Sequence, residues 1–424
     1  MEKLNNNFLN SQGQNLKALE IGFPITNKPE KILQFGEGNF LRAFVDFFID
    51  ELNEKNLFDG SVVVVQPIGE DTTLTDMINA QDSNYTVLLR GLENGQPVNR
   101  TRIVTSLSRV LNLYRDFNEY MNTMKNPDLR FIVSNTTEAG IVYVQTDMPS
   151  ETALTPPDSF PAKVTSLLWQ RFNHFNGAKD KGFIFIPCEL IDNNGTNLKE
   201  IVLRHAKEWH LPQEFINWVN ENNHFTNTLV DRIVTGYPKD EIESITNTLG
   251  YKDDLVVTGE IFHFFAIEAT KEATKEINAV LPFSKAGQQV VLTEDATPYK
   301  LRKVRILNGA HTMSVLAARL SGKETVGEMM DSQVFNDYLR KGIYEEIIPV
   351  LTGVSQEELT TFADSVFDRF KNPHIKHYLL SIALNSVSKF KARVLPTILE
   401  YYNKNKSLPP TLTFSFAALI ALQR

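Results

Sequence analysis

The sequence predicts an α/β protein with two domains, an N-terminal domain built on a parallel sheet and a mostly α-helical C-terminal domain. Two observations predict this fold class. Short β-branched runs alternate with amphipathic stretches up to about Pro187, and strand signals almost vanish after Thr258. Strands separated by helices indicate a parallel sheet. A chain of 424 residues is also too long for one compact core.

The elements follow from local patterns. The expected strands are short β-branched runs, namely Lys31–Phe35, Ser61–Gln66, Tyr85–Leu89, Arg130–Ser134 and Gly182–Pro187. Apolar residues recur at helical spacing within Arg42–Asn56, which predicts a helix between the first two strands. The expected C-terminal helices are Phe262–Val280, Pro298–Ser321, Val326–Tyr344, Glu357–Phe370, Ile375–Lys391 and Leu395–Tyr402. Glycine, proline and charged residues cluster in Pro238–Lys252, so we place the domain boundary there.

Composition limits the class of function. The chain has 43 Lys and Arg against 51 Asp and Glu, a net charge of −8, which argues against a protein that binds nucleic acid or anionic lipid. No apolar run approaches the length of a membrane span, and the N-terminus does not resemble a signal peptide. The single cysteine, Cys188, excludes intramolecular disulfides and a cysteine-built zinc site. We expect a cytoplasmic enzyme with neither nucleic acid nor membrane as a partner.

Gly36 and Gly38 follow the first expected strand, and a helix is expected directly after them. Glycine lets the backbone turn tightly and approach a pyrophosphate, and a helix N-terminus offers free N–H groups to that anion. The third position of the G-x-G-x-x-G fingerprint is Leu41, so a simple tight turn remains an alternative. The second strand ends at Gln66 without the acidic residue that contacts the ribose, and only Asp71 lies nearby. This strand therefore leaves the choice between NAD and NADP open.

A second polar segment is expected at the same edge of the sheet. The fourth expected strand ends at Ser134 and is followed by Asn135, Thr136 and Thr137. Ligands of doubly wound sheets lie at the carboxyl ends of strands, so these residues are candidates for the nicotinamide side of a dinucleotide. The alternative is an N-capping turn in which Asn135 or Thr136 starts the next helix.

The helix expected over Pro298–Ser321 begins with a basic segment, Lys300–Arg305. Lys303, Asn308 and His311 share one broad face, because His311 lies about 80° from Lys303 and about 60° from Asn308 at about 100° per residue. Reducing a ketone with a nicotinamide needs a proton donor at the carbonyl oxygen and hydrogen-bond donors that polarise it. The surrounding positive charge would attract an anionic substrate. The alternative is a solvated first turn, with Asn308 and His311 as satisfied interior residues.

Together these segments resemble the mannitol dehydrogenase family of polyol-specific long-chain dehydrogenases. The resemblance is carried by Phe35–Phe44, Val133–Glu138, Val230–Ile233, Thr258–Glu260, Lys303-x4-Asn308-x2-His311 and Arg369–Pro373. It implies a Rossmann-type NAD-binding domain over residues 1–250, a helical substrate domain over residues 251–424, and catalysis in the cleft between them. It implies NAD as the cofactor, with contacts from Phe35, Gly36, Gly38, Asn39, Phe40, Arg42, Ser134, Asn135 and Thr136.

The resemblance also implies chemical roles. Lys303 would be the general acid/base, Asn308 would help to hold the substrate oxygen, and His311 would support the site. Asp231 matches a functional position of the family, with a structural Asp–Arg pair as the alternative. The lysine and the amide donors would polarise the carbonyl, so no metal is expected.

Two departures from mannitol-type members suggest a different substrate. Those members carry Cys-Asp-Asn where this chain has Cys188–Leu190, so one oxyanion donor is missing unless Asn194 replaces it. They also carry a substrate-binding arginine where this chain has Ser381. Lys389 is retained, and Arg393 follows one helical turn later. We expect Lys389 and Arg393 to bind the carboxylate of a sugar acid, with a solvated helix charge as the alternative for Arg393.

Within the family, the resemblance is strongest to the branch that reduces tagaturonate to altronate with NADH in hexuronate (galacturonate) catabolism. Reduction of fructuronate to mannonate is the nearest alternative. A metal-dependent enzyme is a second one, since His374-x-x-His377 and Glu260-x-x-His263 have helical ligand spacing, and a non-catalytic NAD-binding protein is a third. We expect a small sugar acid as the partner and a monomer or weak oligomer. Family members usually continue past the equivalent of Arg424, which is consistent with a C-terminal truncation.

Overall fold

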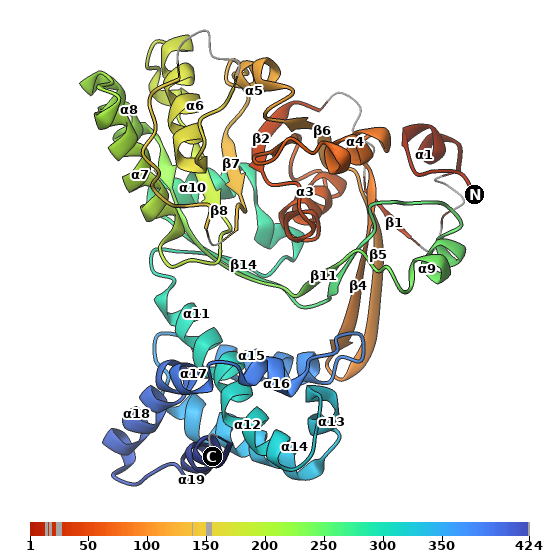
Figure 1. The fold of residues 1–424 in the computed structure, drawn as a ribbon, viewed down its shortest axis with the longest axis vertical. Helices are drawn as coiled ribbons and strands as arrows, with labels where there is room; N and C mark the ends of the chain where they lie inside the picture. The colour runs from red at the N-terminus through yellow and green to blue at the C-terminus, as the bar shows by residue number, and fades with distance from the viewer. Residues whose placement is uncertain (13–15, 17–18, 23–27, 138, 150–154, 423–424) are drawn as a thin grey trace. The chain divides into compact units, whose positions relative to one another are not determined.

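The computed structural model describes residues 1–12, 16, 19–22, 28–137, 139–149 and 155–422. The chain forms two compact units (Figure 1). The first comprises residues 1–89, 100–259 and 263–294, and the second comprises residues 90–99, 260–262 and 295–424. In the described parts of the chain, no helix is both long and apolar enough to cross a membrane.

The main sheet of the first unit has six described strands, all paired in parallel, in the order β6-β3-β2-β7-β8-β9. Its strands are β2 (Glu30–Phe35), β3 (Ser61–Gln66), β6 (Leu107–Asn112), β7 (Phe131–Ser134), β8 (Ile184–Pro187) and β9 (His224–Phe225). Numbered along the chain, this is the 3-2-1-4-5-6 order of a doubly wound Rossmann sheet. The predicted N-terminal fold class is confirmed. Buried parallel strands read as continuous apolar runs, which is why the sequence revealed them.

Helices cover this sheet and bury a large apolar core. They are α2 (Asn39–Arg42), α3 (Val45–Glu54), α4 (Thr73–Ala80), α5 (Phe117–Thr123), α6 (Phe160–His174), α7 (Asn194–Glu208) and α8 (Gln213–Asn222). Figure 1 shows α6, α7 and α8 grouped beside β8. In the core, the ring of Phe35 at the end of β2 packs edge-on against Tyr120 and Phe160, with ring centroids 6.1 and 5.1 Å away. This packing fixes the end of β2, from which the glycine loop begins.

Two smaller sheets complete the first unit. One has the order β1-β5-β4-β12-β11, and the other the order β10-β13-β14. Their strands are β1 (Glu20–Ile21), β4 (Tyr85–Glu93), β5 (Gln96–Val104), β10 (Asn227–Asp231), β11 (Val234–Gly236), β12 (Val257–Glu260), β13 (Phe264–Glu268) and β14 (Val290–Thr293). The remaining helices are α1 (Asn6–Gln12), α9 (Ile242–Leu249) and α10 (Lys271–Val280).

The loss of strands expected after Thr258 is wrong. The helix expected over Phe262–Val280 is a strand, β13, followed by the shorter helix α10. Both β13 and β14 lie beyond Thr258 and pair in parallel. The apolar run Phe264–Ile267 is compatible with a strand or a buried helix, and only its pairing with β10 decides between them.

The second unit is helical, as expected, around its own apolar core. Its helices are α11 (Thr297–Arg302), α12 (Gly309–Leu320), α13 (Val326–Met330), α14 (Gln333–Arg340), α15 (Gln356–Phe370), α16 (Leu379–Ala383), α17 (Ser386–Arg393), α18 (Leu395–Asn405) and α19 (Pro410–Leu422). Two π-helical segments interrupt the series, η4 (Lys303–Asn308) and η5 (Lys341–Ile347). The single helices expected over Val326–Tyr344 and Ile375–Lys391 are each broken, at Asp331–Ser332 and at Leu384–Asn385.

The structure divides the units at Glu294 and Asp295, later than the Pro238–Lys252 segment that the sequence suggested. The difference arises because β12, β13 and β14 extend the sheets of the first unit beyond that segment. The tip of the β4–β5 hairpin, residues 90–99, belongs to the second unit. There the backbone N–H of Gly95 donates to the Asp368 carboxylate, and the Asn372 side chain donates to the carbonyl of Arg90.

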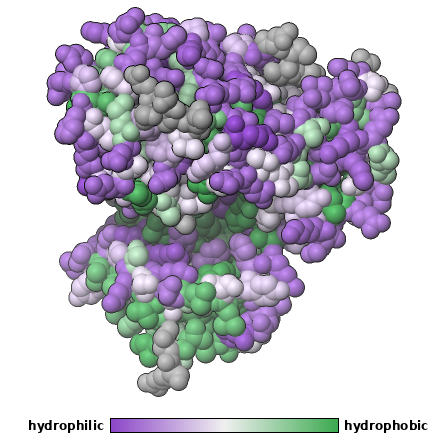
Figure 2. All heavy atoms as spheres, turned by 45° about the horizontal axis from the view of Figure 1, so that its top comes forward, coloured by the Kyte–Doolittle hydropathy of each residue, from purple (hydrophilic) through white to green (hydrophobic). Residues whose placement is uncertain are grey.

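Apolar side chains gather on the surface of the second unit (Figure 2). The exposed large apolar residues near the end of the chain are Leu380, Leu384, Val387, Leu395, Leu399, Tyr402, Leu408, Phe414, Phe416 and Ile420. A helix that is apolar on every side is normally covered, but the side chains of Phe414 and Phe416 in α19 are about half exposed. This part of the second unit therefore presents an apolar surface.

Asp46 on α3 gives the first unit a pH-dependent stability. Its carboxyl is buried and accepts a hydrogen bond from Gln34, and burial raises its pKa to about 7. The folded chain keeps this proton up to about pH 7, whereas the unfolded chain loses it near its usual pKa of 3.8. The free energy of unfolding should therefore fall as the pH rises between these values, by at most about 1.4 kcal/mol per pH unit.

Urea unfolding of the parent chain and of Asp46→Asn at pH 5, 6, 7 and 8 measures this effect. The asparagine variant lacks the titration, so the difference in unfolding free energy between the two proteins should change with pH up to about 7 and then level off. A difference that is constant from pH 5 to pH 8 would contradict the assignment.

Candidate functional site

The loop after β2 has the backbone that its glycines predict. Gly36 has a φ of +116°, and a Cβ placed on it would lie 2.9 Å from the carbonyl oxygen of Asn135. Gly38 has a φ of −67°, and a Cβ placed there would meet no described atom within 4 Å. The helix after it is interrupted, because Phe44 has non-helical φ and ψ angles between α2 and α3. The open space at Gly38 is what close approach of a pyrophosphate requires, so these residues fit a dinucleotide.

Four neighbouring residues expected at the cofactor are engaged within the first unit. The Arg42 guanidinium donates to the Leu255 carbonyl at 2.8 Å and to the Asn39 side-chain oxygen at 2.7 Å. Burial lowers the pKa of Arg42. Phe35 lies in the core, and Phe40 stacks on a neighbouring phenylalanine ring. The contacts of Phe35, Asn39, Phe40 and Arg42 shape the loop from inside, while Gly36 and Gly38 set the path of its backbone.

The two glycines give a matched pair of variants. In Gly36→Ala the positive φ and the contact with Asn135 should lower the free energy of unfolding by about 1–3 kcal/mol and weaken NADH binding as well. In Gly38→Ala the backbone is unstrained, so the thermal midpoint should stay unchanged while the Kd for NADH rises by at least about tenfold. For each variant, thermal unfolding measures the stability and fluorescence titration measures the Kd for NADH. If Gly38→Ala binds NADH as tightly as the parent chain, this loop does not hold the pyrophosphate.

The turn after β7 is organised by a buried carboxylate. Ser134 donates to Glu189 at 3.1 Å, and Thr136 donates to it from its backbone N–H at 3.0 Å and its hydroxyl at 2.9 Å. Asn135 donates to the carbonyl of Cys188 at 2.8 Å. Burial raises the pKa of Glu189, and these hydrogen bonds oppose the shift. No helix begins in the described residues between Ser134 and α6, so the N-capping alternative is not observed.

Asn194 begins α7, the next element after β8, and Asp231 ends β10. The buried Asn194 amide donates to the carbonyls of Pro187 and Glu189 at 3.0 and 3.1 Å, and its oxygen accepts from the Thr228 N–H at 2.9 Å. These bonds hold the turn between β8 and α7, and the substrate role of Asn194 stays a prediction. Asp231 is the last residue of β10 and is only 7% exposed.

In the second unit, the expected catalytic helix contains a π-helical turn. Lys303–Asn308 forms η4, between α11 and α12. In an α-helix, residues five positions apart point about 140° away from each other. A π-turn closes a hydrogen bond between such residues, so Lys303 and Asn308 lie on nearly the same side, one turn apart. Such turns occur frequently at functional sites.

His311 follows on α12 in an electropositive environment. Its ring stacks on Phe370, with centroids 4.2 Å apart, and its Nε2 atom is buried without a hydrogen-bond partner in the described structure. Burial and then nearby positive groups lower the pKa of His311 to about 3, so the imidazole is neutral near pH 7. The neighbouring groups that contribute, in decreasing order of effect, are the His377 imidazole and the cations Arg369, Arg393 and Lys389.

Lys389 and Arg393 on α17 supply uncompensated positive charge. Lys389 donates to the Ile382 carbonyl at 2.9 Å. The Arg393 guanidinium lies 3.5 Å from the hydroxyl of Thr312, which donates to the Asn308 carbonyl at 2.8 Å. Burial lowers the pKa of both cations. Among the described residues, neither forms an ion pair with a carboxylate, so this part of the second unit is suited to an anion.

Arg369, in contrast, is neutralised within the second unit. Its Nε and one terminal nitrogen each donate to a different oxygen of Glu260, both at 2.9 Å, and both side chains are buried. The guanidinium also lies over the ring of Phe262. Two of the segments that carry the family resemblance thus meet in one buried ion pair.

The helical spacing expected for metal ligands is wrong. His374 and His377 lie in the loop between α15 and α16, and Glu260 ends β12 three residues before His263. The described residues contain no group of three or more His, Cys, Asp or Glu side chains that could hold a metal ion.

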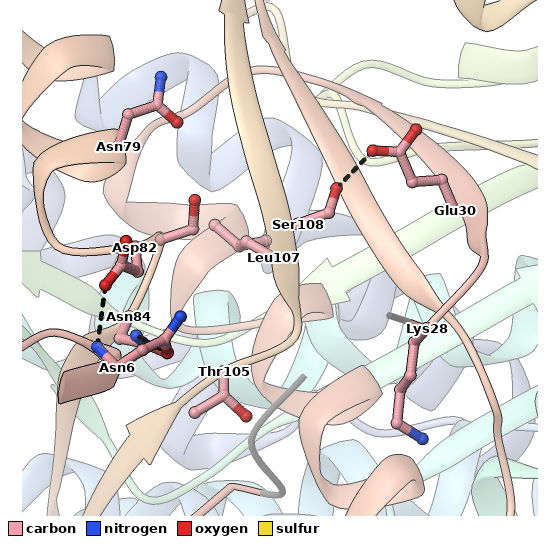
Figure 3. Close-up of a pocket in the computed structure, with 10 residues that line it drawn as sticks. Asn6, Lys28, Glu30, Asn79, Asp82, Asn84, Thr105, Leu107 and Ser108 are labelled. Carbon is pink, nitrogen blue, oxygen red and sulfur yellow. Dashed lines mark hydrogen bonds between the residues drawn. The ribbon is translucent and has the colours of Figure 1, made fainter. Parts of the chain in front are cut away.

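A polar pocket of about 450 Å³ lies elsewhere in the first unit (Figure 3). It is lined by Asn6, Lys28, Glu30, Asn79, Asp82, Ser83, Asn84, Thr105, Leu107 and Ser108. Its polar groups bond to one another: the Ser108 hydroxyl donates to the Glu30 carboxylate, and the backbone N–H of Asn6 donates to the Asp82 carboxylate. Glu30 and Leu107 begin β2 and β6, so the pocket is at the amino ends of these strands, opposite the glycine loop.

Comparison with known proteins shows which family the chain belongs to. Residues 30–279 match the family model described as the mannitol dehydrogenase Rossmann domain, and residues 295–424 match the mannitol dehydrogenase C-terminal domain. The chain belongs to the mannitol dehydrogenase family. The altronate oxidoreductases of Yersinia enterocolitica and Shigella flexneri are relatives of it, each 49% identical over 95% of this chain and 81% of the relative.

Solved structures share the fold of this mannitol dehydrogenase family member. A D-sorbitol dehydrogenase has a TM-score of 0.80 at 23% identity, covering 100% of this chain and 85% of that protein. The Pseudomonas fluorescens mannitol 2-dehydrogenase, solved with NAD and D-mannitol, has a TM-score of 0.68 at 22% identity, covering 99% and 84%. These structures confirm the predicted fold, and the two family models confirm the predicted family.

Sequence reasoning about this family member missed two residues. In the sequence, Glu189 was noted only as a departure from the Cys-Asp-Asn pattern of mannitol-type members. In the structure, it accepts the hydrogen bonds that organise the turn at Ser134 and Thr136. His377 was assigned to a metal pair, whereas its ring lies beside His311. The family pattern at Cys188 drew attention to Glu189, the next residue. Nothing in the sequence around His377 indicated that it lies beside His311.

Proposed function

We propose that this chain interconverts D-tagaturonate and D-altronate with NADH and NAD, in hexuronate (galacturonate) catabolism. The observation that carries the proposal is its 49% identity to an altronate oxidoreductase over 95% of the chain. The substrate and product are carboxylate anions. The uncompensated charges of Lys389 and Arg393 support an anionic substrate independently of that likeness.

The first unit would hold the dinucleotide. Gly36 and Gly38 would let the backbone approach the pyrophosphate, and the turn Ser134–Thr136 would line the nicotinamide side. When bound, NADH supplies the hydride for reduction of the ketone. Glu189 holds the turn in place through Ser134 and Thr136, so the position of these polar groups does not depend on the cofactor.

The second unit would supply the proton and the hydrogen bonds. Lys303 donates a proton to the carbonyl oxygen during reduction and accepts it during oxidation. Asn308 donates a hydrogen bond to the same oxygen, because the π-turn sets both side chains on one side. The neutral His311 offers its unpartnered Nε2 to the substrate, while Lys389 and Arg393 bind the carboxylate. The substrate role of Asp231 stays a prediction.

The reverse reaction tests the proposal. NADH formation is followed with altronate and with mannonate, the product of the fructuronate alternative. We expect kcat/KM for altronate to exceed that for mannonate by at least about a hundredfold, because the two acids differ in hydroxyl configuration and a site built around hydroxyls discriminates strongly. The opposite order would assign fructuronate as the keto acid. NADH formation from neither acid would contradict the proposed activity.

A further inference from the structure

His377 has a fixed backbone position in the second unit. The Val326 N–H donates to the His377 carbonyl, and the Leu379 N–H donates to the Glu324 carbonyl, both at 2.9 Å. Between them, Thr325 and Tyr378 form an antiparallel bridge. The backbone of residues 324–326, which leads into α13, therefore fixes the backbone position of residues 377–379.

The His377 ring lies beside the catalytic candidate His311. Their centroids are 6.1 Å apart with an interplanar angle of 61°. Burial and then the charge of Arg369 lower the pKa of His377. Both imidazoles are therefore neutral near pH 7, and a neutral imidazole has one N–H donor and one acceptor nitrogen.

In the described chain, the two imidazoles lack hydrogen-bond partners, and the cations Lys389 and Arg393 lack an ion-pair partner. His311 Nε2 is buried without a hydrogen bond, and no described group bonds to either ring nitrogen of His377. Lys389 and Arg393 have no carboxylate beside them, whereas Arg369 is already neutralised by Glu260. A purely structural cluster would satisfy such donors internally. A group with several acceptor oxygens and a negative charge would satisfy them together.

We propose that His377 is a substrate-recognition residue that donates a hydrogen bond to the carboxylate of the sugar acid beside Lys389 and Arg393. The inference rests on the proposed function and deepens it, because it explains how this member selects a sugar acid over an uncharged sugar. The carboxylate offers two oxygens with about four lone-pair sites, enough for two cations and one imidazole N–H.

Steady-state kinetics of tagaturonate reduction at saturating NADH test the assignment. His377→Phe keeps a flat ring but removes the donor, so KM for tagaturonate should rise by about tenfold to a hundredfold. The values of kcat and of KM for NADH should stay within about twofold of the parent chain. His377→Gln keeps an amide donor, so its KM for tagaturonate should lie between that of the parent chain and that of His377→Phe. Lys376→Met is the matched control, because it removes an exposed cation one residue away and should leave KM unchanged.

The outcomes separate the two proposals. If the parent chain reduces no keto-hexonate, the proposed function fails, and this inference with it. If the parent chain is active, an unchanged KM in His377→Phe overturns the role of His377 alone. An equal rise of KM in Lys376→Met, or a loss of kcat at constant KM, also overturns it. Should His377→Phe fail to fold, His377→Gln decides, with a rise in KM of at least about threefold expected.

Discussion

Replacing Lys303 by alanine is expected to lower kcat for tagaturonate reduction by about 10²–10⁴-fold, the usual contribution of a positioned proton donor. Lys303 lies at the start of the π-turn and shares a side with Asn308. The residues proposed to hold the dinucleotide lie in the first unit, so the Kd for NADH should remain nearly that of the parent chain. Rapid kinetics of NADH oxidation together with NADH titration measure the two effects separately.

Lys300→Ala is the matched control, because it removes an exposed cation from the same basic segment, one turn earlier. Its kcat should stay near that of the parent chain. Added primary amines should partly restore the turnover of Lys303→Ala, since a small amine supplies the missing proton. Full turnover in Lys303→Ala would contradict the assigned role, whereas joint loss of turnover and NADH binding would point to a folding defect.

Replacing Arg369 by methionine is expected to lower the free energy of unfolding by about 3–5 kcal/mol, because it removes the guanidinium that pairs with the buried Glu260 carboxylate. The variant also removes the guanidinium that lies over Phe262. Urea unfolding, followed by a probe of the second unit, measures the loss. Since Phe370 next to it stacks on His311, the variant should lower kcat as well.

The double variant Glu260→Gln with Arg369→Met tests whether the charge is the cause. Removing both charges should recover most of the lost stability, because no unpaired charge then remains buried. A double variant that loses the sum of both single losses would show that the two residues act independently. That result would contradict the buried ion pair.

The sequence predicts the parts of the fold that depend on burial. The runs at Ser61–Gln66 and Phe131–Ser134 are apolar because their strands are covered on both faces, so the doubly wound sheet could be inferred. Elements that depend on pairing between distant segments could not be predicted from the sequence. Phe264–Glu268 reads equally well as helix, and the tip of the β4–β5 hairpin joins the second unit only through contacts at Asp368 and Asn372.

For the candidate site, the predictable features are those that a single residue type requires. The positive φ at Gly36 needs glycine, so the loop was visible in the sequence. The π-turn was not visible, because the Lys303–Asn308 spacing is equally compatible with a regular helix. Nor was the position of His377, which is set by backbone bonds to Val326 and Glu324 on another element.

The most direct test of the account compares a keto acid with an uncharged ketose. We measure kcat/KM of NADH oxidation with tagaturonate and with D-fructose under the same conditions. No carboxylate of the described residues pairs with Lys389 or Arg393, so we predict that tagaturonate is preferred by at least about a hundredfold. Equal efficiency with both substrates, or turnover of fructose alone, would contradict a sugar-acid reductase.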